Sequence, residues 1–221
     1  MNGQIPVDYS YWNNSYSPST PLVYGYEEVE GLIQKAHKRE VNYYGQTDLF
    51  LYAALDQFLS HICGKRVAIM GSNVPWYEAI VIAYGGTAVT IEYNKIISKH
   101  PGIETMTVAE FAKKPETFDA VLSISSYEHD GLGRYGDPID PQGDLKAMER
   151  TKAMLKPGGL LFLAIPVGKE RIIWNANRVY GPKRLPMLFA GWKTIATFGF
   201  EAEVNFARQD PEQPVFVLAL E

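Results

Sequence analysis

Cysteine is almost absent from this 221-residue sequence, which contains only Cys63. A single cysteine cannot form an intrachain disulfide, so a disulfide-stabilised fold is excluded, and we expect Cys63 to be a small buried residue near a helix end. Long apolar runs are also missing, because no segment approaches the roughly 20 apolar residues of a membrane span. The first 20 residues have neither the basic nor the apolar region of a signal peptide, and we therefore expect a cytoplasmic protein.

An excess of positive charge is missing as well. The chain has 21 Lys and Arg against 25 Asp and Glu, which gives a formal net charge of -4. Such a chain has no excess of positive charge to attract a polyanion, so nucleic acid is not an expected partner. The length and the 46% of hydrophobic residues predict one sizeable packed domain.

Residues 1–45 are rich in Tyr, Asn, Ser and Pro and contain one predicted helix, at 26–38. Tyrosines and a tryptophan are dense in this region, and aromatic side chains usually bury their surface. We interpret residues 1–45 as an extension that caps part of a main domain at 46–221.

The main domain alternates predicted helices and strands. A helix at 47–64 with Thr47 as its N-cap comes first, and a closing hairpin of 200–206 and 214–221 comes last. A helix at 144–159 is expected to end at its Pro-Gly-Gly, and a further helix covers 184–192. The alternation predicts an α/β fold with an open, mainly parallel sheet that has helices on both faces. The other elements are strands at 66–70, 87–93, 104–108, 118–125 and 160–167 and a helix at 76–86.

Ligands of such a sheet bind beyond the carboxyl ends of its strands, which directs attention to the loop GSNVPWYE after the first strand. Gly71 allows a sharp turn and leaves room for a ligand, while Ser72 and Asn73 offer polar contacts before a helix. Glu92 closes the second strand at the spacing typical of an acidic residue that binds ribose hydroxyls. The alternatives are an ordinary strand-to-helix turn and a solvated strand end.

Two later stretches carry a resemblance. FDAVLSISSYEHDG (118–131) resembles the fourth strand of class I S-adenosylmethionine-dependent methyltransferases, and LKPGGLLFLAIP (155–166) resembles their next helix end and fifth strand. Within that superfamily, 128–148 and 175–188 are similar to a domain-of-unknown-function family that occurs beside glycosyltransferases. The resemblance covers about 46–221.

The resemblance implies a Rossmann-like fold with a seven-stranded sheet in the order 3-2-1-4-5-7-6 and S-adenosylmethionine as the cofactor. The first loop departs from the superfamily's G-x-G-x-G, so N-terminal aromatics such as Tyr43 and Tyr44 are candidates for the missing contacts. The predicted cofactor-binding residues are Gly71, Ser72, Asn73, Glu92, Tyr93, Thr107, Val108 and Ser125.

His129 follows the fourth strand at the edge where substrate should lie, and histidine titrates near working pH, so we predict it to be the catalytic base. Asp130 is assigned to the catalytic pair with it. Asp130 and Asp137 could also hold Mg²⁺ or Mn²⁺. The alternatives are that Glu128 and His129 only organise the loop and that the aspartates orient His129 or cap the helix at Asp144.

Donor groups beside aromatic rings suit a hydroxyl-rich substrate, and we assign Arg134, Tyr135, Asn177 and Arg178 to substrate binding. The leading hypothesis is an O-methyltransferase acting on a small molecule or a glycan, with a deoxyhexose such as rhamnose as the acceptor. The expected partners also include a second copy of the chain and glycosyltransferases. The alternatives are a non-catalytic methyltransferase-like binding domain and a nicotinamide-dependent oxidoreductase, which the absence of G-x-G-x-x-G disfavours.

Overall fold

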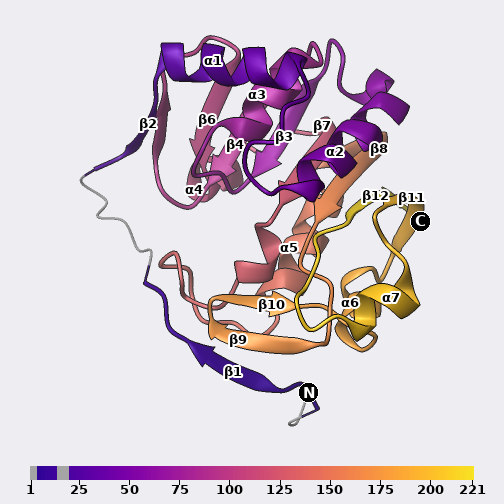
Figure 1. The fold of residues 1–221 in the computed structure, drawn as a ribbon. Helices are drawn as coiled ribbons and strands as arrows, with labels where there is room; N and C mark the ends of the chain where they lie inside the picture. Colours follow the sequence, from indigo (N-terminus) through magenta and orange to yellow (C-terminus); the bar gives the residue numbers. More distant parts are fainter. Residues whose placement is uncertain (1–3, 14–19) are drawn as a thin grey trace.

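The computed structural model describes residues 4–13 and 20–221, and a seven-stranded sheet forms its centre (Figure 1). Five neighbouring strands are parallel, whereas β12 runs antiparallel to both β8 and β11. The sheet is therefore mixed, and its strands, numbered along the chain, stand in the order 3-2-1-4-5-7-6. From edge to edge they are β6 (Ile103–Thr107), β4 (Thr87–Glu92), β3 (Arg66–Met70), β7 (Phe118–Ile124), β8 (Leu155–Ala164), β12 (Val215–Leu220) and β11 (Trp192–Phe198).

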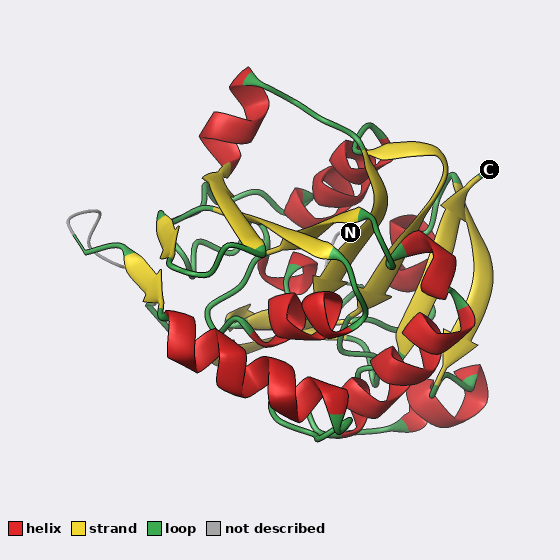
Figure 2. Cartoon of the chain, turned by 90° about the horizontal axis from the view of Figure 1, so that it is seen from above, coloured by secondary structure: helices red, strands yellow, loops and turns green. Residues whose placement is uncertain are grey.

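Helices cover both faces of this sheet, as Figure 2 shows from above. Successive side chains of a strand point to opposite faces, so Val67 and Ile69 enter one core while Ala68 enters the other. Each core includes residues of the helices on its own side of the sheet. The burial of one Val or Ile side chain contributes about 1.5–3 kcal/mol to the stability of the fold. The first layer has α1 (Tyr26–His37), α2 (Gln46–Gln57) and α3 (Trp76–Ala83), and the second has α4 (Val108–Lys113), α5 (Gly143–Lys152) and α6 (Arg184–Leu188).

Two small sheets attach the N-terminal segment to the rest of the chain. Strand β1 (Val7–Ser10) pairs in parallel with β9 (Arg171–Asn175), which pairs antiparallel with β10 (Asn177–Val179). Strand β2 (Leu22–Tyr24) pairs in parallel with β5 (Ile96–Ser98). Among the residues that the structure describes, no helix has both the length and the apolar character needed to span a membrane.

The predicted C-terminal hairpin is wrong in its first strand. Strand β12 pairs with β11, which lies before the stretch predicted to be extended, and most of that stretch forms helix α7 (Ala202–Ala207). The backbone turns at Gly199, whose positive φ of 76° ends β11. Phe200, just before α7, packs against Phe206 of the helix with ring centroids 5.8 Å apart.

Three further details differ from the sequence-based expectations. Helix α5 ends at Lys152, and the Pro-Gly-Gly segment lies inside β8, where the β7–β8 register shifts. Thr47 is not an N-cap, because Gly45 takes that position and the Thr47 hydroxyl donates to the carbonyl of Gln213. Cys63 is exposed and follows a short 3-10 helix, Leu59–His61.

Candidate functional site

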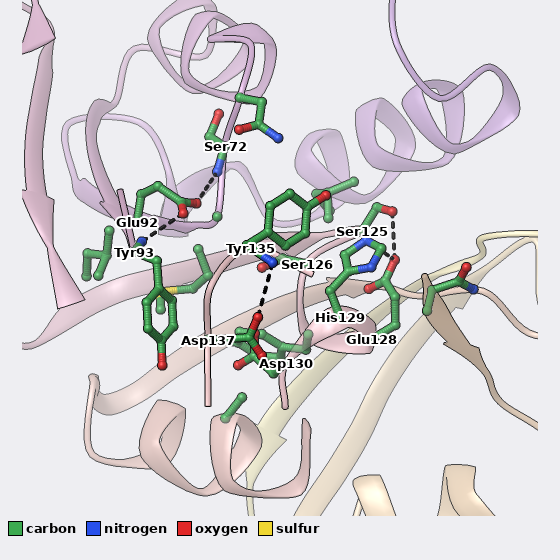
Figure 3. A pocket seen from close by; sticks show the side chains of 18 of the residues that line it. Ser72, Glu92, Tyr93, Ser125, Ser126, Glu128, His129, Asp130, Tyr135 and Asp137 are labelled. Carbon is green, nitrogen blue, oxygen red and sulfur yellow. Dashed lines mark hydrogen bonds and ion pairs between the residues drawn. The ribbon is translucent and has the colours of Figure 1, made fainter. Parts of the chain in front are cut away.

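A cavity of about 890 Å³ lies beyond the carboxyl ends of the parallel strands (Figure 3). Gly71, Glu92, Val108, Ser125 and Pro166 line it, and each ends or closely follows one of the five parallel strands. Cavities of 300–1,000 Å³ at this position of an α/β sheet are typical ligand sites. The strand ends therefore place the predicted residues from distant parts of the sequence around one cavity.

The loop after β3 and the end of β4 are joined through the Glu92 carboxylate. It accepts hydrogen bonds from the backbone amides of Ser72 (3.1 Å) and Tyr93 (2.7 Å). Burial raises the pKa of Glu92, and these amides oppose the shift because they stabilise the ionised form. Gly71 has φ of 69°, and a Cβ there would overlap the Ser126 hydroxyl, so the close approach requires glycine. Asn73 also lines the cavity.

Glu78 on α3 is fully buried behind this loop, and its Oε1 accepts a hydrogen bond from the Thr90 hydroxyl (2.7 Å). Burial raises the pKa of Glu78 to about 7, while hydrogen bonds with Thr90 and Ser72 oppose the shift. The folded chain therefore holds this proton to a higher pH than the unfolded chain does, and stability is lost as pH rises through 7.

Glu78→Gln should remove this pH dependence. Between pH 5 and pH 8 we expect the wild type to lose about 1–3 kcal/mol of unfolding free energy relative to the variant. Urea denaturation at both pH values measures the difference, with Glu203→Gln as an exposed control. Parallel pH profiles for the wild type and Glu78→Gln would contradict the burial argument.

One end of the cavity is apolar. Val108, Phe111 and Ala112 are spaced i, i+3 and i+4 on α4, so they present one helix face to the cavity. Pro115 and Met154 complete this part. Thr107 was predicted to bind the cofactor, but it does not belong to the lining. Its hydroxyl caps α4 by accepting a hydrogen bond from the amide of Glu110 (3.1 Å).

His129 lies at the other end, in the short 3-10 helix Tyr127–His129 that follows β7. Its Nδ1 is 2.6 Å from the carbonyl oxygen of Ala176, and a carbonyl only accepts, so Nδ1 carries the hydrogen. In the neutral ring Nε2 is then a hydrogen-bond acceptor, 3.6 Å from Oε1 of Glu128. Burial lowers the pKa of His129 to about 4, which keeps the ring neutral at pH 7.

Glu128 is fully buried beside His129 (Figure 3). The Ser125 hydroxyl donates to its Oε1 (2.7 Å), and the side-chain amide of Gln213 donates to the same hydroxyl (3.3 Å). Burial raises the pKa of Glu128 to about 7. Oε2 of Glu128 and Oε1 of Gln213 have no hydrogen-bond partner within the described part of the chain. A buried unpaired oxygen costs about 1–3 kcal/mol, so both atoms mark a place where a ligand could supply donors.

The two aspartates predicted as metal ligands have separate partners. Asp137 accepts hydrogen bonds from the amides of Gly131 (2.7 Å) and Gly133 (3.1 Å), and it thereby organises the loop. Asp130 lies 3.5 Å from Arg150, and burial raises its pKa to about 7. Across residues 4–13 and 20–221, no three His, Cys, Asp or Glu side chains group as a metal site. Both aspartates line the cavity.

Arg178 was predicted to bind substrate, but its side chain is 1% exposed and does not line the cavity. It donates to the carbonyl oxygens of Glu128 (3.2 Å) and Asp130 (2.7 Å) from below the loop. Its charge lies 3.7 Å from the buried carboxylate of Asp144. The sequence alone does not show which of Arg134 and Arg178 points into the cavity.

Arg134, Tyr135 and Asn177 do line the cavity, at the His129 end. The Arg134 guanidinium donates to the Ala176 carbonyl (3.4 Å), which also accepts from His129. Its Nε is buried without a partner among the described residues. The aromatic extension reaches the same cavity, since Tyr43 and Tyr44 belong to its lining.

Sequence reasoning missed several lining residues. The helical spacing after Val108 was a usable signal for Phe111 and Ala112, which share its helix face. Gln213 had no local signal, because only the pairing of β12 with β8 brings it to the cavity. The other missed residues include Tyr77, Arg150, Met154, Arg171 and Ile173.

A family model described as "Caenorhabditis protein of unknown function, DUF268" matches residues 64–213. A search of curated proteins finds no match. Among solved structures, similarity extends to a 1,6-didemethyltoxoflavin-N1-methyltransferase from Burkholderia thailandensis, with a TM-score of 0.54 and 14% identity over 87% of this chain and 79% of that one. That protein was solved with S-adenosylhomocysteine.

Two further structures have the same overall fold. A glycopeptide N-methyltransferase, also solved with S-adenosylhomocysteine, has a TM-score of 0.54 and 10% identity over 82% of this chain and 93% of its own. A TehB-like S-adenosylmethionine-dependent methyltransferase from Corynebacterium glutamicum has a TM-score of 0.52 and 13% identity over 88% and 99%. At these identities the likeness establishes a Rossmann-like methyltransferase fold.

Proposed function

The chain belongs to the family described as "Caenorhabditis protein of unknown function, DUF268", and from that premise and its fold we propose that it is an S-adenosylmethionine-dependent methyltransferase. The observation that carries the proposal is the convergence of Gly71, Glu92 and Val108 on one cavity at the carboxyl ends of β3, β4 and β6. These strand ends form the ligand crevice of Rossmann-like sheets.

The residues present fit this cofactor. Gly71 places bare backbone on the cavity wall, packed against Ser126, and the Glu92 carboxylate lines the cavity as an acceptor for ribose hydroxyls. The apolar end at Val108 and Phe111 offers flat surface for the adenine ring. Ser72, Asn73, Tyr93 and Ser125 also line the cavity and complete the proposed cofactor set.

When bound, the cofactor would supply a methyl group that leaves its positively charged sulfur for the acceptor oxygen. We assign His129 as the base that would hold the acceptor's proton at Nε2, with Glu128 next to the charged ring. The Nδ1 contact with Ala176 fixes the ring in the tautomer that this step requires. Asp130 is paired with Arg150 instead, and we assign it to the cavity wall.

The proposed acceptor is a hydroxyl of a sugar or glycan, with a deoxyhexose such as rhamnose as the first choice. Support comes from the planar groups of Tyr135 and Arg134 and the amide of Asn177, which line the cavity beside His129. Sugar rings bind to mixtures of flat apolar surface and convergent hydrogen-bonding groups. Association with glycosyltransferases rests on the family resemblance alone.

Calorimetry with S-adenosylhomocysteine tests the cofactor assignment. We expect micromolar binding by the wild type and an affinity about 10-fold to 100-fold lower for Glu92→Ala, because hydrogen bonds to a charged group contribute about 1.5–3 kcal/mol each. The exposed Glu27→Ala should bind like the wild type. No binding of S-adenosylhomocysteine or S-adenosylmethionine by the wild type would overturn the proposal.

A further inference from the structure

A row of planar side chains leads from the outer surface to His129. The ring of Trp12 lies over the guanidinium of Arg134, with 5.6 Å between the ring centroid and the guanidinium carbon. The same guanidinium lies 5.1 Å from the ring centroid of Tyr135. The Tyr135 ring meets the His129 ring edge to face, with centroids 5.5 Å apart. The end of the cavity that His129, Arg134 and Tyr135 line, which we call the acceptor end, is therefore in contact with Trp12 of the N-terminal segment.

The outer end of this row is anchored by backbone pairing. Strand β1 runs beside β9 from Val7 opposite Ile172 to Ser10 opposite Asn175. Two residues further on, the backbone amide of Trp12 donates to the side-chain oxygen of Asn175 (2.7 Å), which is buried. Since β9 contributes Arg171 and Ile173 to the cavity lining, β1 pairs directly with a strand of the cavity wall (Figure 1).

Large aromatic surface is exposed on this segment. Tyr9 is 85% exposed, Tyr11 75% and Trp12 52%. Clustered exposed aromatic rings mark interaction sites, and rings that present one apolar face and a polar edge suit sugars. The chain's net charge of -4 disfavours a polyanionic ligand. These features favour a neutral saccharide over nucleic acid as the occupant.

We propose that the acceptor is an oligosaccharide that extends out of the cavity, with its second sugar residue packed on Trp12 and Tyr11. This inference rests on the proposed function, because the first sugar residue must lie at His129 for the second to reach Trp12. The N-terminal segment lies outside residues 64–213, which the family model matches. In this proposal the segment sets the length of saccharide that the protein accepts.

The test is calorimetry of protein saturated with S-adenosylhomocysteine, titrated with α-linked rhamnose saccharides of one, two and three residues. The wild type should bind the disaccharide about tenfold more tightly than the monosaccharide, which corresponds to about 1.4 kcal/mol. Trp12→Ala should abolish this gain and leave the affinity for the monosaccharide within twofold. Tyr11→Ala, which keeps Trp12 on Arg134, should reduce the gain.

The matched control is Tyr26→Ala, a partly exposed tyrosine on α1 that stacks on His100 away from the cavity lining. Tyr26→Ala should still bind the disaccharide about tenfold more tightly than the monosaccharide. Equal affinity for all three saccharides, an unchanged gain in Trp12→Ala, or no saccharide binding by protein that binds S-adenosylhomocysteine would each overturn the inference and leave the cofactor assignment standing. Failure to bind S-adenosylhomocysteine would instead overturn the proposed function and this inference with it.

Discussion

Replacement of His129 by asparagine is expected to lower kcat for methyl transfer by about 100-fold to 10,000-fold, the range typical of a lost general base. The asparagine amide can still donate to the Ala176 carbonyl, where Nδ1 of His129 donates at 2.6 Å, but nothing replaces the acceptor atom Nε2. Transfer of a labelled methyl group from S-adenosylmethionine measures the rate. Calorimetry should show unchanged binding of S-adenosylhomocysteine, because His129 lies at the acceptor end.

Glu128→Gln separates the two candidate proton acceptors of this end. Glu128 lies next to His129, with 3.6 Å between Oε1 and Nε2, and burial raises its pKa to about 7. If His129 is the base, Glu128→Gln should reduce kcat less than His129→Asn does, because it removes only the neighbouring charge. Full activity in His129→Asn together with an inactive Glu128→Gln would transfer the role to Glu128.

Asp144→Ala is expected to destabilise the fold by about 3–5 kcal/mol, the usual effect of removing one partner of a buried ion pair. The Asp144 carboxylate is fully buried and accepts hydrogen bonds from Nε of Arg184 (2.8 Å) and the hydroxyl of Tyr180 (2.9 Å). Arg178 lies 3.7 Å from it. Without Asp144, two buried guanidinium groups lose their counter-charge.

Chemical denaturation measures this effect, and Asp140→Asn, in the loop just before α5, is the matched control. Asp140 pairs with Lys146 at the surface, where an ion pair contributes little. Near-wild-type stability of Asp144→Ala would show that Arg178 and Arg184 do not depend on this carboxylate. Because Arg178 supports the backbone at Glu128 and Asp130, the loss of Asp144 should also weaken the acceptor end of the cavity.

The sequence predicted the central sheet well because its strands carry strong local signals. Arg66–Met70 and Phe118–Ile124 are short, apolar and bounded by turn residues, and both form central strands. Gly71 and Glu92 could be assigned because their positions follow from the strand ends alone. The same reasoning brought His129, Arg134 and Tyr135 to the cavity, since all three follow the fourth strand of the sheet.

The remaining features depend on contacts that no local pattern encodes. The two arginines of the rim look alike in sequence, yet Arg134 lines the cavity and Arg178 supports the loop from inside. Thr107 caps a helix with Glu110, although its position at a strand end suggested ligand binding. Trp12 comes to Arg134 only because β1 pairs with β9, more than 160 residues away in the chain.

A crystal structure with S-adenosylhomocysteine bound shows directly whether this cavity holds the cofactor. We expect ribose hydroxyls on the Glu92 carboxylate, adenine between Val108 and Phe111, and the sulfur facing Nε2 of His129. Binding outside the cavity that begins at Gly71, or a sulfur turned away from His129, would contradict the proposed function.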